Sequence, residues 1–195
     1  MIEFRDTVYM TRGRTGLIIG GAFGLAFIAV NAGAAAPLTV PMRLLAIAAF
    51  VGLFFASRPP AAGAGADATA RTEPAAPAAR TAFGRRYWLV VAAEAVAALA
   101  GLFLTARVFH APHLAVACIA LVVGVHFFAL AAVWRQTSLH VLGAAMTACG
   151  AAGLLLGVAG AGAAAVSAVA GIAPGVLLLA SAWWSALAAR PRAAL

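Results

Sequence analysis

Long stretches of apolar residues with almost no charge are the feature that most constrains this fold. They cover residues 15–35, 38–57, 87–109, 113–134, 138–159 and 163–187. Each reaches the roughly 20 residues with which a helix crosses about 30 Å of hydrocarbon. The stretches lack the alternating pattern of strands, and open sheet edges are not tolerated in lipid. The sequence therefore predicts an all-α polytopic membrane protein with six transmembrane helices.

The composition excludes a soluble domain. Only 9% of the residues are charged, whereas soluble domains carry about 25%. The net charge of +8 is due entirely to arginine, because the chain has no lysine. These arginines lie between the apolar stretches, so we interpret them as determinants of membrane orientation and expect no nucleic acid partner.

The arginines also predict which side of the membrane each loop occupies. Only Arg43 and Arg107 fall on one side, and the other arginines fall on the opposite side. Cytoplasmic loops carry the excess of basic residues, so the larger set is expected in the cytoplasm. The four tryptophans, Trp88, Trp134, Trp183 and Trp184, lie at the ends of the stretches on that same side. Both termini are therefore predicted to be cytoplasmic, in a multi-pass protein of the cytoplasmic membrane.

A change in composition divides the chain between its second and third apolar stretches. Residues 58–86 are rich in alanine and proline, which predicts a disordered cytoplasmic linker. The expected organisation is a cytoplasmic tail (1–14), a transmembrane hairpin (15–57), the linker, a four-helix transmembrane unit (87–187) and a second cytoplasmic tail (188–195). The first stretch has the length of a span and not of a cleaved signal peptide, so we expect it to remain as an anchor.

Glycines spaced four residues apart predict close helix packing. They are Gly16, Gly20 and Gly24 in the first stretch, Gly153 and Gly157 in the fifth, and Gly171 and Gly175 in the sixth. Small residues at this spacing let another helix backbone approach. Packing within one subunit is the leading interpretation, and homodimer contact or a glycine-lined path are the alternatives. Pro174 should kink the sixth helix.

Glu94 and His126 are the best candidates for polar chemistry. Glu94 is the only acid inside an apolar stretch, and His126 is the only histidine deep inside one. Counting residues at about 1.5 Å each places both roughly 12–14 Å from the cytoplasmic boundary, on antiparallel neighbouring helices. They meet if their helix faces match. Such a pair is either a structural contact between helices or a relay for protons or cations.

The other polar residues indicate little chemistry. Arg43 is expected to extend to the outer headgroups, or else to bind an anionic ligand or a polar group of the bundle. His110 and His113 form an H-x-x-H pair without further ligands, so no metal site is predicted. His140 is poorly matched in depth to His126, which disfavours haem. Cys118 and Cys149 lie in apolar stretches, where cysteine behaves as a small hydrophobe.

The third and fourth stretches resemble a family of small uncharacterised bacterial membrane proteins. The resemblance is carried by Tyr87-Trp88-Leu89-Val90-Val91 with Glu94, and by Val122-Val123-Gly124-Val125-His126-Phe127-Phe128. In that family a proline often follows His-Phe-Phe, whereas this chain has Ala129. The resemblance implies that Glu94 and His126 belong to one motif. It implies no activity.

Three functional classes fit these observations. The first is a membrane protein that acts through helix contacts as an accessory, scaffold or sensor subunit, with a homo-oligomer or another membrane protein as its partner. The second is a small proton-coupled transporter or channel that uses Glu94 and His126. The third, an enzyme or haem protein, is disfavoured because catalytic motifs are missing and polar groups are sparse. We expect no catalytic residues, no metal and no cofactor, and the first class leads.

Overall fold

The structure is a computed structural model that describes residues 3–58 and 85–189, with the side chains of residues 3–14 and Arg86 excepted. Most of the linker (59–84) and most of the second tail (190–195) lie outside the described residues. The first tail is helical from Glu3 onward, because α1 spans Glu3–Asn31.

The described residues form helices that match the six predicted spans. After α1, a 3-10 turn (Ala32–Ala35) leads to α2 (Thr39–Ala56), and α3 (Arg85–Phe103) follows the linker. The chain continues through α4 (Ala115–Trp134) and α5 (Thr137–Val158). The last span consists of α6 (Ala163–Ser167), a π-helical turn (Ala168–Ile172) and α7 (Ala173–Ala188). Six of these segments are long and apolar enough to cross a membrane, so the chain is an all-α, multi-pass membrane protein.

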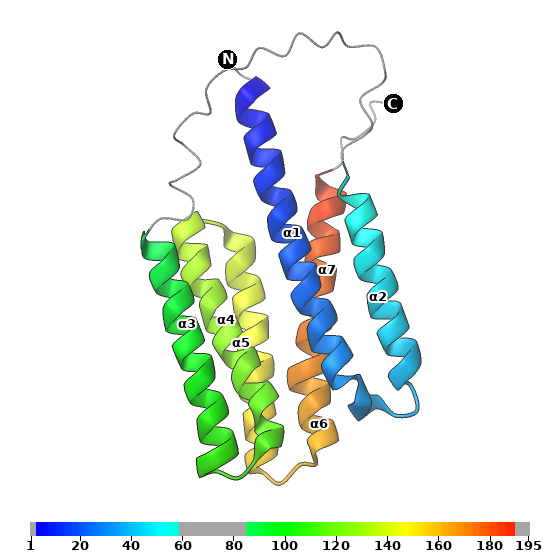
Figure 1. Cartoon of the computed structure of the whole chain (residues 1–195), viewed down its shortest axis with the longest axis vertical. Helices are drawn as coiled ribbons and strands as arrows, with labels where there is room; N and C mark the ends of the chain where they lie inside the picture. Colours follow the sequence, from blue (N-terminus) through cyan, green and yellow to red (C-terminus); the bar gives the residue numbers. More distant parts are fainter. Residues whose placement is uncertain (1–2, 59–84, 190–195) are drawn as a thin grey trace.

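The spans alternate in direction along one bundle (Figure 1). The end of α2, the start of α3, the α4–α5 turn and the end of α7 lie at one end of the bundle, together with the first residues of α1. The turns from α1 to α2, from α3 to α4 and from α5 to α6 lie at the opposite end. Arg58, Arg85 and Arg135 occupy the first end, whereas Arg43 and Arg107 occupy the second. The structure thus groups the arginines that it describes as the positive-inside argument requires.

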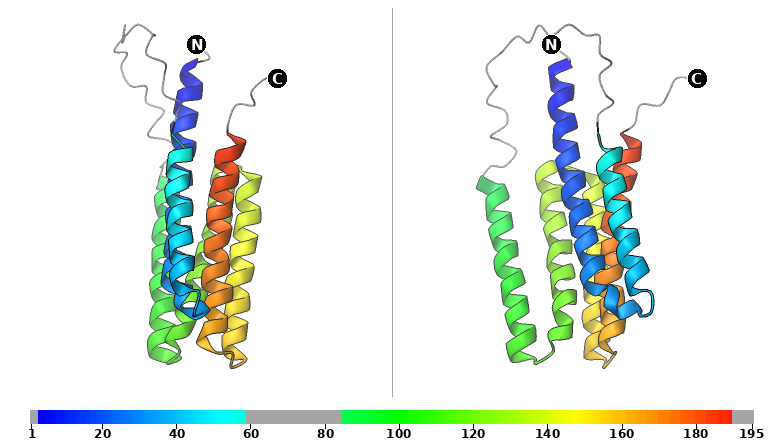
Figure 2. Two further views of the ribbon diagram at one scale, coloured as in Figure 1. Left: turned by 90° about the vertical axis from the view of Figure 1, so that its right-hand side faces the viewer. Right: turned by 45° about the vertical axis from the view of Figure 1, so that its right-hand side comes forward.

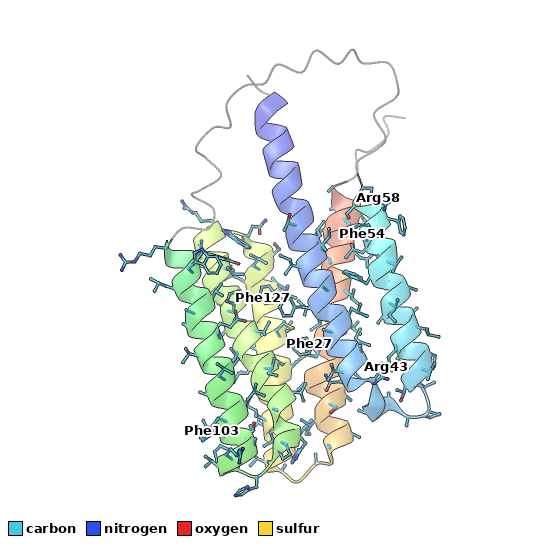
Figure 3. The ribbon with its side chains drawn as sticks, viewed as in Figure 1. Phe27, Arg43, Phe54, Arg58, Phe103 and Phe127 are labelled. Carbon is cyan, nitrogen blue, oxygen red and sulfur yellow. The ribbon has the colours of Figure 1, made fainter. Side chains whose placement is uncertain are left out.

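The core forms where helices from the two sides of the linker pack together. α1 lies along α7 and α2 beside both, so the hairpin is joined to the last span (Figure 2). α4 and α5 form the closest pair. Phe27 of α1 joins the main apolar cluster, which includes Met146, Val166 and Leu178, and Phe127 packs against the same cluster from α4 (Figure 3). The linker therefore divides the sequence but not the packed bundle.

Glycines set the separation between α1 and the last span. A Cβ on Gly24 would lie 2.8 Å from the carbonyl oxygen of Gly175, and a Cβ on Gly175 would lie 2.8 Å from that of Gly24. Gly171 lies against the side chain of Asn31, which is buried and donates from Nδ2 to the carbonyl oxygen of Phe27 at 2.9 Å. These contacts lie within one chain, as the leading interpretation of the glycine pattern predicts.

Packing within the subunit is not found for the first two glycines of α1, and the alternative of homodimer contact remains a prediction for them. A Cβ at Gly16 or Gly20 would meet nothing within 4 Å among the described residues. The two helices approach most closely near Gly24, and the backbone of α7 is no longer in contact at Gly20. In contrast, Gly153 packs against Ala117 and Ala170, and Gly157 packs against Leu114.

Pro174 lies at the start of α7, directly after the π-helical turn Ala168–Ile172. Proline lacks the N–H that would continue the α-helical ladder, and its ring clashes with the preceding turn. A π turn is one of the local adjustments that accommodate proline within a span. The predicted irregularity of the sixth span therefore takes the form of a widened turn, with Pro174 and Gly171 both buried.

Candidate functional site

Glu94 and His126 meet between α3 and α4. Their Oε2 and Nδ1 atoms lie 2.9 Å apart. Glu94 is nine residues after Arg85, the first residue of α3, and His126 is eight residues before Trp134, the last residue of α4. At about 1.5 Å per residue, this places both roughly 12–14 Å from the same end of the bundle. The predicted match in depth therefore agrees with the coordinates, and the faces of the two helices, which residue counts left open, bring the side chains together.

The two nitrogens of the His126 ring have different surroundings. Nδ1 is buried, and although it lies close to Glu94, it is not aligned well enough for a hydrogen bond. The two atoms are thus within ion-pair distance. The contact is a full ion pair only when the ring is protonated. Nε2 is not among the buried unpartnered atoms of the described residues, and the side chain is 13% exposed. Glu94 therefore lies against the buried Nδ1 side of the ring, and Nε2 faces away from the contact.

Glu94 belongs to the least buried span. Only 6% of the most apolar window of α3 is buried, against 39% for the last span. α3 packs mainly on α4. A second contact joins them further along, where a Cβ on Gly101 would lie 3.3 Å from the Cβ of Cys118. An acid inside a span usually faces the bundle interior, yet the Glu94 side chain is 25% exposed at the margin of this bundle.

Arg43 of α2 contacts the C-terminal end of α1. Its Nε donates a hydrogen bond of 2.9 Å to the carbonyl oxygen of Ala29, and the residue is exposed (Figure 3). The last carbonyls of a helix lack partners within the helix and carry partial negative charge, so a guanidinium group is favourable there. Of the alternatives predicted for Arg43, contact with a polar group of the bundle is therefore present. The exposure of Arg43 also leaves room for a lipid headgroup.

The remaining histidines lie away from the pair. His110 and His113 are exposed at the α3–α4 turn, at the end of the bundle that carries Arg107. His140 is exposed near the start of α5, where its ring centroid lies 6.2 Å from that of Phe128. Neither set shares the depth of His126. The structure thus brings one acid and one histidine together and leaves the other histidines apart.

Sequence reasoning missed the glycines between α4 and α5. Gly124 lies against the backbone and hydroxyl group of Thr147, and Gly150 lies against the backbone of Leu121. Thr147 Oγ1 is buried without a conventional hydrogen-bond partner among the described residues. The Cβ position of Gly124 points at this oxygen, so a Gly124 Cα–H points at it too, and Cα–H···O contacts recur where helices pack closely. The spacing of seven residues between Gly143 and Gly150 is the signal that could have revealed this face.

Trp183 makes a contact between helices that was not predicted from the sequence. Its Nε1 donates a hydrogen bond of 3.0 Å to the carbonyl oxygen of Ala49, and its ring contacts Gly52. It therefore joins α7 to α2. Trp88 and Trp184 are exposed, as residues at an interface with lipid headgroups would be.

The fold and the site together define a multi-pass membrane protein with one acid–imidazole pair inside its described spans. A scan against protein-family models, a search of curated proteins and a search of solved structures find no match to the chain. Its function is therefore argued from the geometry alone.

Proposed function

We propose that this chain is an integral membrane protein that acts through helix contacts, as an accessory, scaffold or sensor subunit. The observation that carries this proposal is the position of α3. This helix is held on α4 by the Glu94–His126 pair and the Gly101–Cys118 contact, and it exposes large apolar side chains elsewhere. The exposed fractions are 59% for Leu89, 67% for Val96, 67% for Leu99 and 62% for Phe103. Such a helix is available to pack against a further membrane helix.

Photocrosslinking in intact membranes tests this proposal. A photoreactive amino acid would replace Val96 on α3 or Val141 on α5, two valines that are both 67% exposed. We expect one discrete protein adduct from position 96 and only lipid adducts from position 141. An adduct of twice the chain's mass would identify a homo-oligomer, and any other single mass would identify a partner protein. Lipid adducts alone at both positions, or the same protein adducts at both, would contradict the proposal.

A second candidate function, a proton-coupled transporter or channel, is favoured by the 2.9 Å contact between Glu94 and His126. Ionisable groups inside a span are often part of ion pathways and proton relays. Proteoliposomes with an internal pH-sensitive dye test this candidate. It requires proton flux that is lost in Glu94→Gln and kept in Cys118→Ser, which alters a residue of the same interface without removing the acid. Absence of flux from the unmodified protein would reject it.

The orientation and the family remain proposals as well. We propose a cytoplasmic membrane location with both termini inside, which is supported by the arrangement of the described arginines. Membership of the uncharacterised bacterial family is a hypothesis, and the contact between Glu94 and His126 supports its implication that both belong to one motif.

A further inference from the structure

The Glu94 carboxylate lies beside Nδ1 of the His126 ring, with Oε2 2.9 Å from that nitrogen. A carboxylate next to Nδ1 favours the ring tautomer with its proton on that nitrogen, because the proton is then closest to the negative charge. The neutral ring consequently has a lone pair on Nε2. The 2.9 Å separation lies on the Nδ1 side, whereas Nε2 is not among the buried unpartnered atoms of the described residues. The pair therefore presents a hydrogen-bond acceptor at the surface of the bundle.

The surroundings of this acceptor are apolar. The residues one turn away on α3 are Val90 and Ala98, and those on α4 are Val122 and Leu130. At a depth of roughly 12–14 Å from the end of the bundle, the molecular surface is covered by acyl chains rather than by water. Bulk water does not reach this depth of a bilayer, and a polar group left without a partner there is costly. A molecule that satisfies Nε2 must itself be soluble in lipid.

We propose that His126 binds a lipid-soluble molecule that carries one hydroxyl group on an apolar body, such as a long-chain phenol. The hydroxyl group donates a hydrogen bond to Nε2, and the apolar body lies along the partly buried side chains of Val90, Ala98 and Val122. Glu94 is a positioning residue, because it fixes the ring tautomer and does not touch the ligand. This inference goes beyond the proposed function and does not rest on it.

Nitrogen-15 NMR of the full chain, labelled at histidine and embedded in lipid nanodiscs, tests the proposal. The probe is 4-decylphenol, and the matched control is 4-decylanisole, which has the same apolar body but no hydrogen to donate. We expect the Nε2 resonance of His126, assigned from its loss in His126→Gln, to shift with the phenol and not with the anisole. His140, near one end of the bundle, should not respond. Equal shifts with both compounds, or none with either, would overturn the proposal.

The role of Glu94 has its own measurement. In Glu94→Gln we expect the phenol titration to require about ten times more ligand, because an amide no longer holds the proton on Nδ1. Glu94→Asp should recover part of the affinity, which a merely structural defect would not allow. An unchanged titration in Glu94→Gln would remove Glu94 from the site. The comparison of phenol with anisole on the unmodified protein needs no variant, so it remains decisive if Glu94→Gln fails to fold.

Discussion

Gly24 of α1 and Gly175 of α7 lie back to back, each with a missing Cβ that would stand 2.8 Å from the carbonyl oxygen of the other. The opposing atoms belong to the backbone. An added Cβ would therefore force one of the two helices to shift as a whole. This crossing joins the N-terminal hairpin to the last span across the linker. Its two glycines therefore determine how closely the hairpin packs on the last span.

Gly24→Ala should destabilise the protein by about 1–3 kcal/mol, the usual cost of overpacking a close contact. The measurement is thermal unfolding in detergent, followed by the loss of monodisperse protein. Gly16→Ala is the matched control on the same helix, because a Cβ there meets nothing within 4 Å. Alanine also favours helix over glycine, so the control should be unchanged or slightly more stable. Equal losses in both variants would contradict the packing role of Gly24.

A second pair of glycines separates backbone contact from side-chain contact. A Cβ on Gly150 would lie 2.7 Å from the Cα of Leu121, whereas a Cβ on Gly157 would meet the end of the Leu114 side chain. A side chain can change rotamer, but a backbone cannot. Gly150→Ala should therefore lower the unfolding temperature clearly more than Gly157→Ala in the same assay. A larger decrease in unfolding temperature for Gly157→Ala than for Gly150→Ala would show that α4 and α5 can separate easily at Gly150.

The number and positions of the spans could be predicted from the sequence because crossing a bilayer requires a minimum run of apolar residues. The depth match of Glu94 and His126 was also predictable, since a helix has a fixed rise and α3 and α4 are joined by a short turn. Their facing direction was not predictable from residue counts alone. It depends on the rotation of each helix about its axis, which packing determines.

The glycine pattern shows the same limit. Spacing identifies Gly16, Gly20 and Gly24 as equivalent, but two helices that cross at an angle touch closely over only a few turns. The helices therefore touch at Gly24, and a Cβ at Gly16 or Gly20 would make no contact with the described residues. The long-range pairing of α1 with α7 and the π turns Leu104–Val108 and Ala168–Ile172 were not predicted. The pairing of α1 with α7 depends on residues far apart in the sequence, and the turn Ala168–Ile172 on the local accommodation of Pro174.

The contact between Glu94 and His126 predicts an energetic coupling. A double-mutant cycle would combine Glu94→Gln and His126→Gln, with unfolding measured in mixed micelles of increasing denaturing detergent. We expect a coupling of about 0.6 kcal/mol, the typical value for polar contacts between membrane helices. His140→Gln replaces His126→Gln in the control cycle, because His140 lies elsewhere in the bundle. Coupling of the same size in the control cycle, or strict additivity in the first, would contradict a direct contact.

The distribution of arginines predicts the orientation of the chain. Gln136 at the α4–α5 turn and Ala163 at the start of α6 are exposed and lie at opposite ends of the bundle. In a background of Cys118→Ser and Cys149→Ser, we expect a membrane-impermeant maleimide to label Ala163→Cys on intact bacterial cells. Gln136→Cys should react only after permeabilisation, because the basic end remains inside. Ser57→Cys, at the end of α2, should behave like Gln136→Cys because both positions lie at the same end of the bundle. Labelling of Gln136→Cys but not of Ala163→Cys on intact cells would show the opposite orientation. Labelling of both positions on intact cells would rule out a single orientation.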